Sequence, residues 1–193
     1  MLFFISQKLE GLAYRLELLG ECRKLKASGR LLPQQYKSLC FRAPSTYDDF
    51  INFLCFIDNK KTVNLIDIGA NIGKFTTDFF KFFPHSDKIL CIEPIPNLIN
   101  QIKKNTNDKR VKVINAALGS KQEKLTLRYP KADTTLASLH SYNNDVNQFY
   151  KIDETIVEEV EVLKLDDIAS DFSKESNFIV KIDTQGHEIE VIK

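Results

Sequence analysis

The feature that most constrains the fold is an alternation of short apolar runs with amphipathic segments, which begins at residue 62. In order, these stretches are Val63–Ile68, Ile72–Phe83, Ile89–Ile92, Pro96–Lys104 and Val111–Ile114. Continuous apolar runs of this length are typical of strands buried on both faces, so the order predicts a βαβαβ succession. We therefore expect an α/β, Rossmann-like fold, which is a mostly parallel sheet with helices on both faces.

The middle of the chain departs from this alternation. Lys124–Arg128 and Thr155–Val162 alternate like strands on either side of a polar stretch, which predicts a long hairpin-like excursion. A short helix is expected over Asp166–Phe172, and another buried strand over Asn177–Asp183. A last helix is expected to begin near His187.

The first 60 residues are of a different kind, because their pattern is mainly helical. Leucines at positions 9, 12, 16 and 19 recur at spacings of three and four, which places them on one face of a predicted helix. We expect an N-terminal helical segment over residues 1–60, followed by a single α/β domain over residues 61–193.

The composition fits an ordinary soluble globular chain. Its 193 residues are 43% hydrophobic and 27% charged, which is enough for one sizeable core. No apolar run approaches the roughly 18–20 residues that cross a bilayer, so no transmembrane segment is expected. The net charge of +1 gives no overall field for nucleic acid. The four cysteines form no CxxC pair, which favours reduced thiols and a cytoplasmic location.

The strongest chemical signal is the predicted strand-to-helix turn, Asp67-Ile-Gly-Ala-Asn-Ile-Gly73. Glycine lets the backbone turn tightly and approach a ligand closely, and Glu93 ends the next predicted strand, where a carboxylate can bind ribose hydroxyls. The dinucleotide pattern GxGxxG needs glycine at positions 69, 71 and 74, but Asn71 and Lys74 stand at two of them. Asp67 would repel a pyrophosphate, whereas a carboxylate suits the ammonium group of S-adenosylmethionine.

Four motifs, in this order, resemble the FkbM family of S-adenosylmethionine-dependent methyltransferases. They are Asp67-Ile-Gly-Ala-Asn-Ile-Gly73, Glu93-Pro-Ile-Pro96, Asn115-Ala-Ala-Leu-Gly119 and Lys181-Ile-Asp-Thr-Gln-Gly-His-Glu188. The resemblance covers roughly residues 62–193 and implies a class I, Rossmann-like enzyme that methylates a hydroxyl on a sugar, glycolipid or secondary metabolite. This chain has Gln185 where the family more often has an acidic residue.

The same resemblance implies a role for each cofactor-side motif residue. Asp67, Gly69, Asn71 and Gly73 would line the amino-acid end of S-adenosylmethionine, Glu93 would hold its ribose, and Ala116 and Ala117 would lie beside its adenine.

A second group of residues points to catalysis. Asp183 lies at the carboxyl end of a predicted strand, where open α/β sheets bind ligands, and Lys181 shares its face. Methyl transfer to a hydroxyl needs alignment and a base that removes the proton, so Asp183 and His187 are the candidate catalytic residues. Lys181 is interpreted as an ion-pair or sheet-end residue.

One carboxylate does not define a metal site, so no metal is expected. His85 and His140 occur in polar contexts and are expected on the surface.

Two other functions stay open at this point. Class I methyltransferases usually have a larger sheet, so the resemblance implies a C-terminally incomplete domain, with an exposed apolar edge on the strand over residues 177–183. The alternative function is therefore a truncated S-adenosylmethionine-binding module that acts through a partner without turnover. A nicotinamide-dependent reductase is weaker, because glycines are missing at positions 71 and 74. The sequence does not predict the oligomeric state.

Overall fold

The computed structural model describes residues 62–140, 154–170, 172 and 177–193, together with the isolated positions 24, 27, 29 and 57. The chain divides into two compact units, one formed by residues 1–62 and 78–85, the other by residues 63–77 and 86–193. The helices expected over residues 1–60 lie almost wholly outside the described residues. The second unit contains every described strand.

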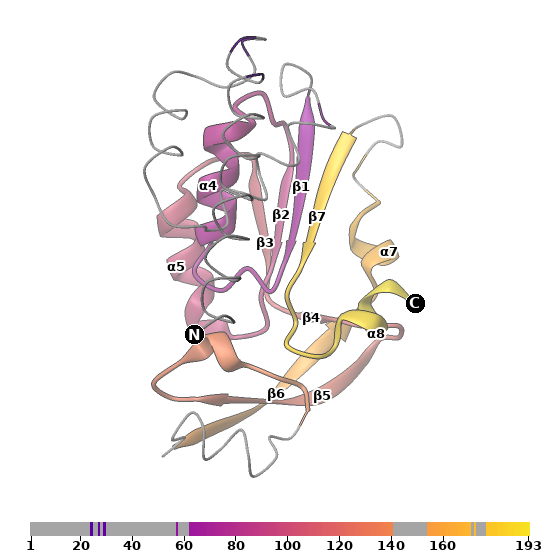
Figure 1. The fold of residues 1–193 in the computed structure, drawn as a ribbon. Coiled ribbons are helices and arrows are strands. Elements are labelled where there is room, and N and C mark those ends of the chain that lie inside the picture. Colours follow the sequence, from indigo (N-terminus) through magenta and orange to yellow (C-terminus); the bar gives the residue numbers. More distant parts are fainter. Residues whose placement is uncertain are drawn as a thin grey trace, which may run out of the picture. The chain divides into compact units, whose positions relative to one another are not determined.

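The core of the second unit is a four-stranded parallel sheet in the order β3-β2-β1-β7 (Figure 1). Its strands are β1 (Val63–Ile68), β2 (Ile89–Ile92), β3 (Val111–Ile114) and β7 (Asn177–Ile182). β1 and β2 are buried along their whole length, as strands covered on both faces are. The predicted α/β fold with a parallel sheet is confirmed, and β1, β2 and β3 have the predicted bounds.

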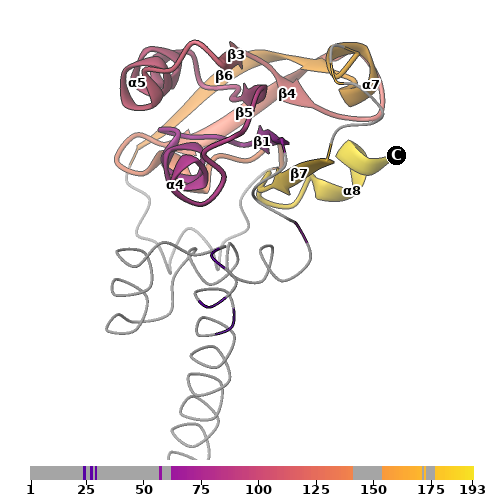
Figure 2. The ribbon, with the colours of Figure 1, turned by 90° about the horizontal axis from the view of Figure 1, so that it is seen from above.

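Helices follow the first two strands, as predicted. α4 (Lys74–Phe82) follows β1, and α5 (Pro96–Thr106) follows β2. α4 begins two residues later than expected, because residues 71–73 form a turn in which Asn71 and Gly73 have positive φ. α5 lies on the opposite side of the sheet from α7 (Leu165–Ile168) (Figure 2).

Alternation along the buried strands sends their side chains to two different faces. One face packs into an apolar cluster with α8 (Glu188–Ile192) and α7; the cluster contains Ile66, Ile68, Leu90, Ile92, Leu118 and Val191. Full burial of an aliphatic side chain contributes about 1.5–3 kcal/mol, so this cluster holds α8 against the sheet. Asp67 and Cys91 alternate with these residues and point to the other face.

A second sheet has the order β4-β6-β5 and lies beyond the carboxyl ends of β1 and β7 (Figure 1). It consists of β4 (Ala117–Leu118), β6 (Thr155–Leu163) and β5 (Glu123–Pro130). β5 and β6 are antiparallel, which confirms the predicted excursion, and β4 pairs in parallel with β6. The short 3₁₀ helix η1 (Thr134–Leu136) follows β5. Apolar side chains of this sheet pack against Ile95 and Leu98 at the start of α5.

None of the helices in the described part of the chain is long and apolar enough to cross a membrane.

Candidate active site

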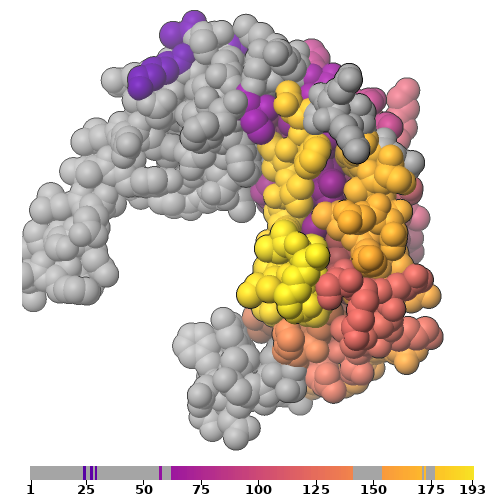
Figure 3. Space-filling model, turned by 90° about the vertical axis from the view of Figure 1, so that its right-hand side faces the viewer, coloured from indigo at the N-terminus to yellow at the C-terminus, as the bar shows by residue number. Residues whose placement is uncertain are grey.

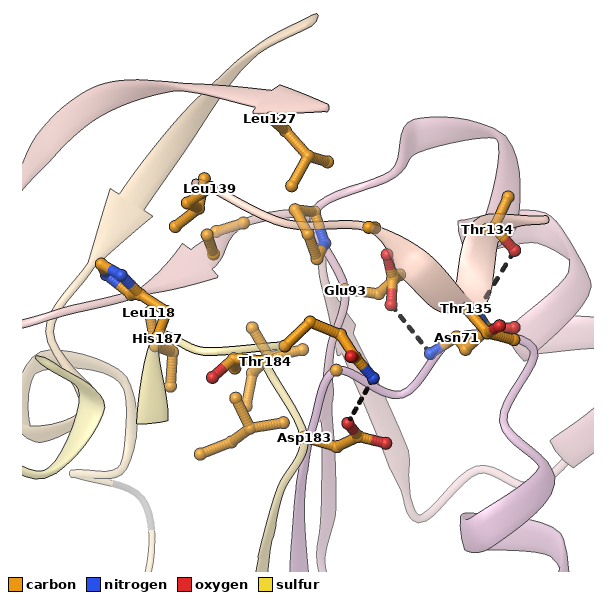
Figure 4. Close-up of a pocket in the computed structure, with 18 residues that line it drawn as sticks. Asn71, Glu93, Leu118, Leu127, Thr134, Thr135, Leu139, Asp183, Thr184 and His187 are labelled. Carbon is orange, nitrogen blue, oxygen red and sulfur yellow. Dashed lines mark hydrogen bonds between the residues drawn. The ribbon is translucent and has the colours of Figure 1, made fainter. Parts of the chain in front are cut away.

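A pocket lies where the carboxyl ends of β1, β2 and β7 face the second sheet (Figure 4). About 730 Å³ of space free of protein atoms lies among its lining residues, and this figure includes space open to solvent. Its walls are the turn after β1, the segments after β2 and β3, the loop after β7, and residues of β5 and η1. Open α/β sheets bind their ligands at this edge, so the pocket is the candidate active site.

The turn after β1 is held by backbone contacts. The amide groups of Gly69 and Ala70 both donate to the carbonyl oxygen of Ile92, over 3.0 and 3.1 Å. Gly69 has a φ of 70°, and a Cβ at this position would overlap the carbonyl oxygen of Asp183. Asn71, with a φ of 50°, donates from Nδ2 to Oγ1 of Thr134 over 3.2 Å. The turn is therefore tied to β2 and η1, and glycine at position 69 lets the loop after β7 approach it.

Glu93 is fixed from two sides. Its Oε2 accepts a hydrogen bond from the amide of Asn71 (2.8 Å), and its Oε1 accepts one from the amide of Ile95 (3.0 Å). The residue is 4% exposed, and burial raises the pKa of its carboxyl group, an effect that the two amide donors oppose. Each carboxylate oxygen can accept more than one hydrogen bond, so Glu93 keeps acceptor capacity toward the pocket.

Asp67 points away from the pocket. Its Oδ2 accepts a hydrogen bond from Oγ1 of Thr76 over 2.8 Å, and its Oδ1 lies 3.3 Å from Nζ of Lys181. Asp67 is completely buried, and this burial raises the pKa of its carboxyl group against the opposing effects of Lys181 and Thr76. Asp67 is thus paired inside the protein.

Lys181 joins three parts of the site. Besides pairing with Asp67, its Nζ donates to the carbonyl oxygens of Gly69 (2.6 Å) and Ile68 (3.2 Å). The same Nζ lies 3.6 Å from Oδ2 of Asp183. This arrangement agrees with the interpretation of Lys181 as an ion-pair residue, and it links the end of β7 to the glycine turn.

The loop after β7 carries Asp183 and adopts left-handed backbone angles. Gln185 has a φ of 52° and Gly186 a φ of 101°. The carboxylate of Glu188 accepts hydrogen bonds from the amides of Thr184 (3.0 Å) and Gly186 (3.1 Å), which closes the loop onto α8. The side chain of Asp183 is about half exposed, and its Oδ1 accepts a hydrogen bond from Nε2 of Gln185.

His187 precedes α8 and is 8% exposed. Its Nδ1 is buried and has no hydrogen-bond partner. Burial lowers the pKa of His187, and the neighbouring His140 lowers it further, so the imidazole is neutral at pH 7. The two rings have centroids 5.5 Å apart. His85 and His140 are exposed, as expected, but no pattern in the sequence indicates that His140 lies beside His187.

The pocket has two ends of different character (Figure 4). Asn71, Thr134 and Thr135 lie at the polar end, while Leu118 and Leu139 lie with His187 at the apolar end. In this view Thr184 lies between Asp183 and His187, so the two candidate catalytic side chains face different parts of the pocket.

The structure brings most of the predicted site residues to this pocket. Those that line it are Gly69, Asn71, Glu93, Ala116, Ala117, Asp183 and His187. Asp67 and Gly73 are not among the lining residues, since Asp67 pairs with Lys181 and Gly73 faces Ile102 and Thr106 of α5. Sequence reasoning missed Leu127 of β5, because nothing in the sequence shows which strand of the excursion faces the pocket.

Within the described residues, no group of three or more His, Cys, Asp or Glu side chains is placed to hold a metal ion.

Comparison with known proteins relates the chain to methyltransferases. The methyltransferase FkbM domain family matches residues 67–193. Among solved structures, the chain resembles a methyltransferase FkbM from Methylobacillus flagellatus KT, with 15% identity and a TM-score of 0.41 over 97% of this chain. It also resembles a SAM-dependent methyltransferase from Leishmania major, with 18% identity and a TM-score of 0.31 over 54% of this chain. The chain spans 45% and 41% of these two proteins. No curated protein matches.

Proposed function

Because this chain belongs to the FkbM family of methyltransferases, we propose that it binds S-adenosylmethionine in the pocket and methylates a hydroxyl group. The hydroxyl would belong to a sugar, a glycolipid or a secondary metabolite. The observation that carries it is the placement of Glu93, a buried carboxylate held at the end of β2 on the pocket wall. The cofactor, when bound, would supply an electrophilic methyl group on a positively charged sulfur.

The residues of the pocket fit this cofactor. Glu93 can accept hydrogen bonds from ribose hydroxyls, and the small side chains of Ala116 and Ala117 leave room for a flat base. Gly69 and Asn71 would border the amino-acid end. The charged side chains among the described lining residues are the two carboxylates Glu93 and Asp183, which suits a cationic ligand. Asp67 would act indirectly, by holding the Lys181 ammonium that binds the carbonyl oxygen of Gly69.

We assign removal of the proton from the acceptor hydroxyl to Asp183 and His187. Asp183 is half exposed at the carboxyl end of β7, and His187 is neutral at pH 7, so each can take a proton from a hydroxyl. We propose these two side chains as the candidate bases, and residues 61–193 as the methyltransferase domain that follows a helical segment over residues 1–60.

The first test is cofactor binding measured by calorimetry. We expect the full chain to bind S-adenosylmethionine, and Glu93→Gln to bind it at least about tenfold more weakly, because one lost charge-assisted hydrogen bond is worth roughly 1.4 kcal/mol or more. Glu159→Gln is the matched control, since Glu159 is an exposed carboxylate paired with Lys124 on the second sheet. Unchanged affinity in Glu93→Gln would overturn the assignment.

A second assay separates the enzyme from a binding module. Radiolabelled methyl transfer to a panel of sugars, glycolipids and hydroxylated metabolites is measured for the full chain, Asp183→Asn and His187→Gln. Turnover that either substitution abolishes supports the proposal. Cofactor binding without turnover on any acceptor selects the non-catalytic module instead.

A further inference from the structure

Gly119 ends one of the four motifs, and the proposed function gives it no role. It is buried directly after β4, and its amide donates to the carbonyl oxygen of Leu163 over 3.0 Å. A Cβ at this position would lie 2.9 Å from Cγ1 of Val162 and 3.3 Å from Nε2 of His187. A side chain at position 119 would therefore meet the imidazole of a candidate catalytic residue, although Gly119 does not itself line the pocket.

The backbone on both sides of this contact is held in place. β4 pairs with β6 through Ala117 and Leu118, next to Gly119, so the chain here cannot withdraw without breaking the second sheet. The carbonyl oxygen of His187 accepts hydrogen bonds from the amides of Glu190 (3.1 Å) and Val191 (3.3 Å) in α8. The two atoms that a Cβ at position 119 would meet both belong to side chains, Cγ1 of Val162 and Nε2 of His187. A methyl group at position 119 would therefore displace these side chains rather than the backbone.

We propose that Gly119 is a positioning residue for His187: the absence of a side chain at position 119 leaves the space in which the imidazole lies against the pocket wall. A role for position 119 in catalysis rests on the proposed function. Its proximity to the imidazole of His187 does not depend on that function.

The surroundings of the ring make its displacement measurable. The ring of His140 lies beside it at an interplanar angle of 49°, and the nearby carboxylates are those of Glu123 of β5 and of Glu188 and Glu190 of α8. Burial is the main cause of the lowered pKa of His187, so a ring pushed toward solvent will titrate closer to the ordinary value of 6.5.

The experiment is NMR of the three imidazoles in the full chain, with His187→Gln used to assign the signal of His187. In the unsubstituted protein we expect a nuclear Overhauser effect between the Hα protons of Gly119 and the ring protons of His187. This measurement needs no variant, and its absence in the folded protein would overturn the inference.

The variants are Gly119→Ala, Val162→Ala and the double substitution, which removes the clash with Val162 and leaves the contact with His187. We expect the His187 signal to shift and its pKa to rise in both chains that carry alanine at position 119, relative to Val162→Ala. The exposed His85 serves as the internal reference. An unmoved His187 signal in the double variant would show that a methyl group fits beside the ring, contrary to the inference. Calorimetry with S-adenosylmethionine on the same samples tests the proposed function separately.

Discussion

At the scale of single residues, the buried pair of Asp67 and Lys181 governs the stability of the site. Asp67 is fully buried, and Lys181 is its cation, which also binds the carbonyl oxygens of Ile68 and Gly69. Removal of one partner from such a pair leaves an uncompensated charge in the interior. The pair therefore stabilises the glycine turn only while both members are present.

We expect Lys181→Met to lower the free energy of unfolding by about 3–5 kcal/mol at pH 7, measured by urea denaturation. Lys124→Met, which breaks an exposed pair with Glu159, is the control and should change stability little. Adding Asp67→Asn to Lys181→Met should restore part of the loss, because the unpaired charge is then gone. A loss in Lys181→Met no larger than in the control would contradict the assignment.

The same variant has a predictable pH dependence. The pKa of Asp67 is raised above its ordinary value of 3.8 in the folded protein. At a pH between 3.8 and this raised pKa, the folded chain therefore binds a proton that the unfolded chain does not. The stability contributed by this group therefore increases as the pH falls through that window. Without Lys181 the pKa of Asp67 rises further. We therefore expect the loss of unfolding free energy in Lys181→Met to become smaller as the pH is lowered. A deficit that grows as the pH falls would contradict this.

At the scale of elements, the turn between β1 and α4 sets how closely the loop after β7 approaches β1. Gly69→Ala introduces a Cβ that overlaps the backbone of Asp183 at a positive φ, and we expect it to destabilise the chain by about 3–5 kcal/mol. Gly73→Ala also has a positive φ, but its Cβ would meet the Thr106 methyl group at 3.3 Å, and we expect a loss of about 1–2 kcal/mol. Thermal denaturation of both variants checks the order, and the reverse order would refute it.

The elements that the sequence predicted best are three strands of the parallel sheet. β1, β2 and β3 have the expected bounds because short, mostly apolar runs that alternate with amphipathic segments are typical of parallel strands. β4 was missed, because two residues carry no periodicity. The face on which Asp67 lies and its pairing with Lys181 could not be predicted either, since β1 and β7 are adjacent only in the folded chain. Most of the pocket was nonetheless predictable, because the motifs fall at strand ends.

At the scale of the whole molecule, β7 and α8 carry most of the large apolar side chains that are exposed among the described residues. The two elements are yellow in Figure 3, and their exposed residues are Phe178, Val180, Ile189 and Ile192. Within the described residues β7 is the last strand of the parallel sheet and pairs only with β1. Exposed apolar side chains on an edge strand favour association between chains.

We expect the protein to self-associate as its concentration rises, measured by sedimentation velocity. The double substitution Phe178→Lys and Val180→Lys should shift the distribution toward the monomer, because it places charge on the exposed face of the edge strand. Val157→Lys is the control, since Val157 is 58% exposed on β6, in the other sheet. An equal shift in the control would show that added charge alone is responsible.

The two amide donors that hold Glu93 affect the entropy cost of ligand binding. The carboxylate already accepts hydrogen bonds from the amides of Asn71 and Ile95 in the free protein, so its rotamer entropy is lost when the chain folds. Association then needs little ordering of this wall, and rigid receptors keep more of their contact energy as affinity. The position of the Glu93 carboxylate would accordingly be set before a ligand binds. A nucleoside would then bind well only if both of its ribose hydroxyls lie within hydrogen-bonding distance of that fixed carboxylate.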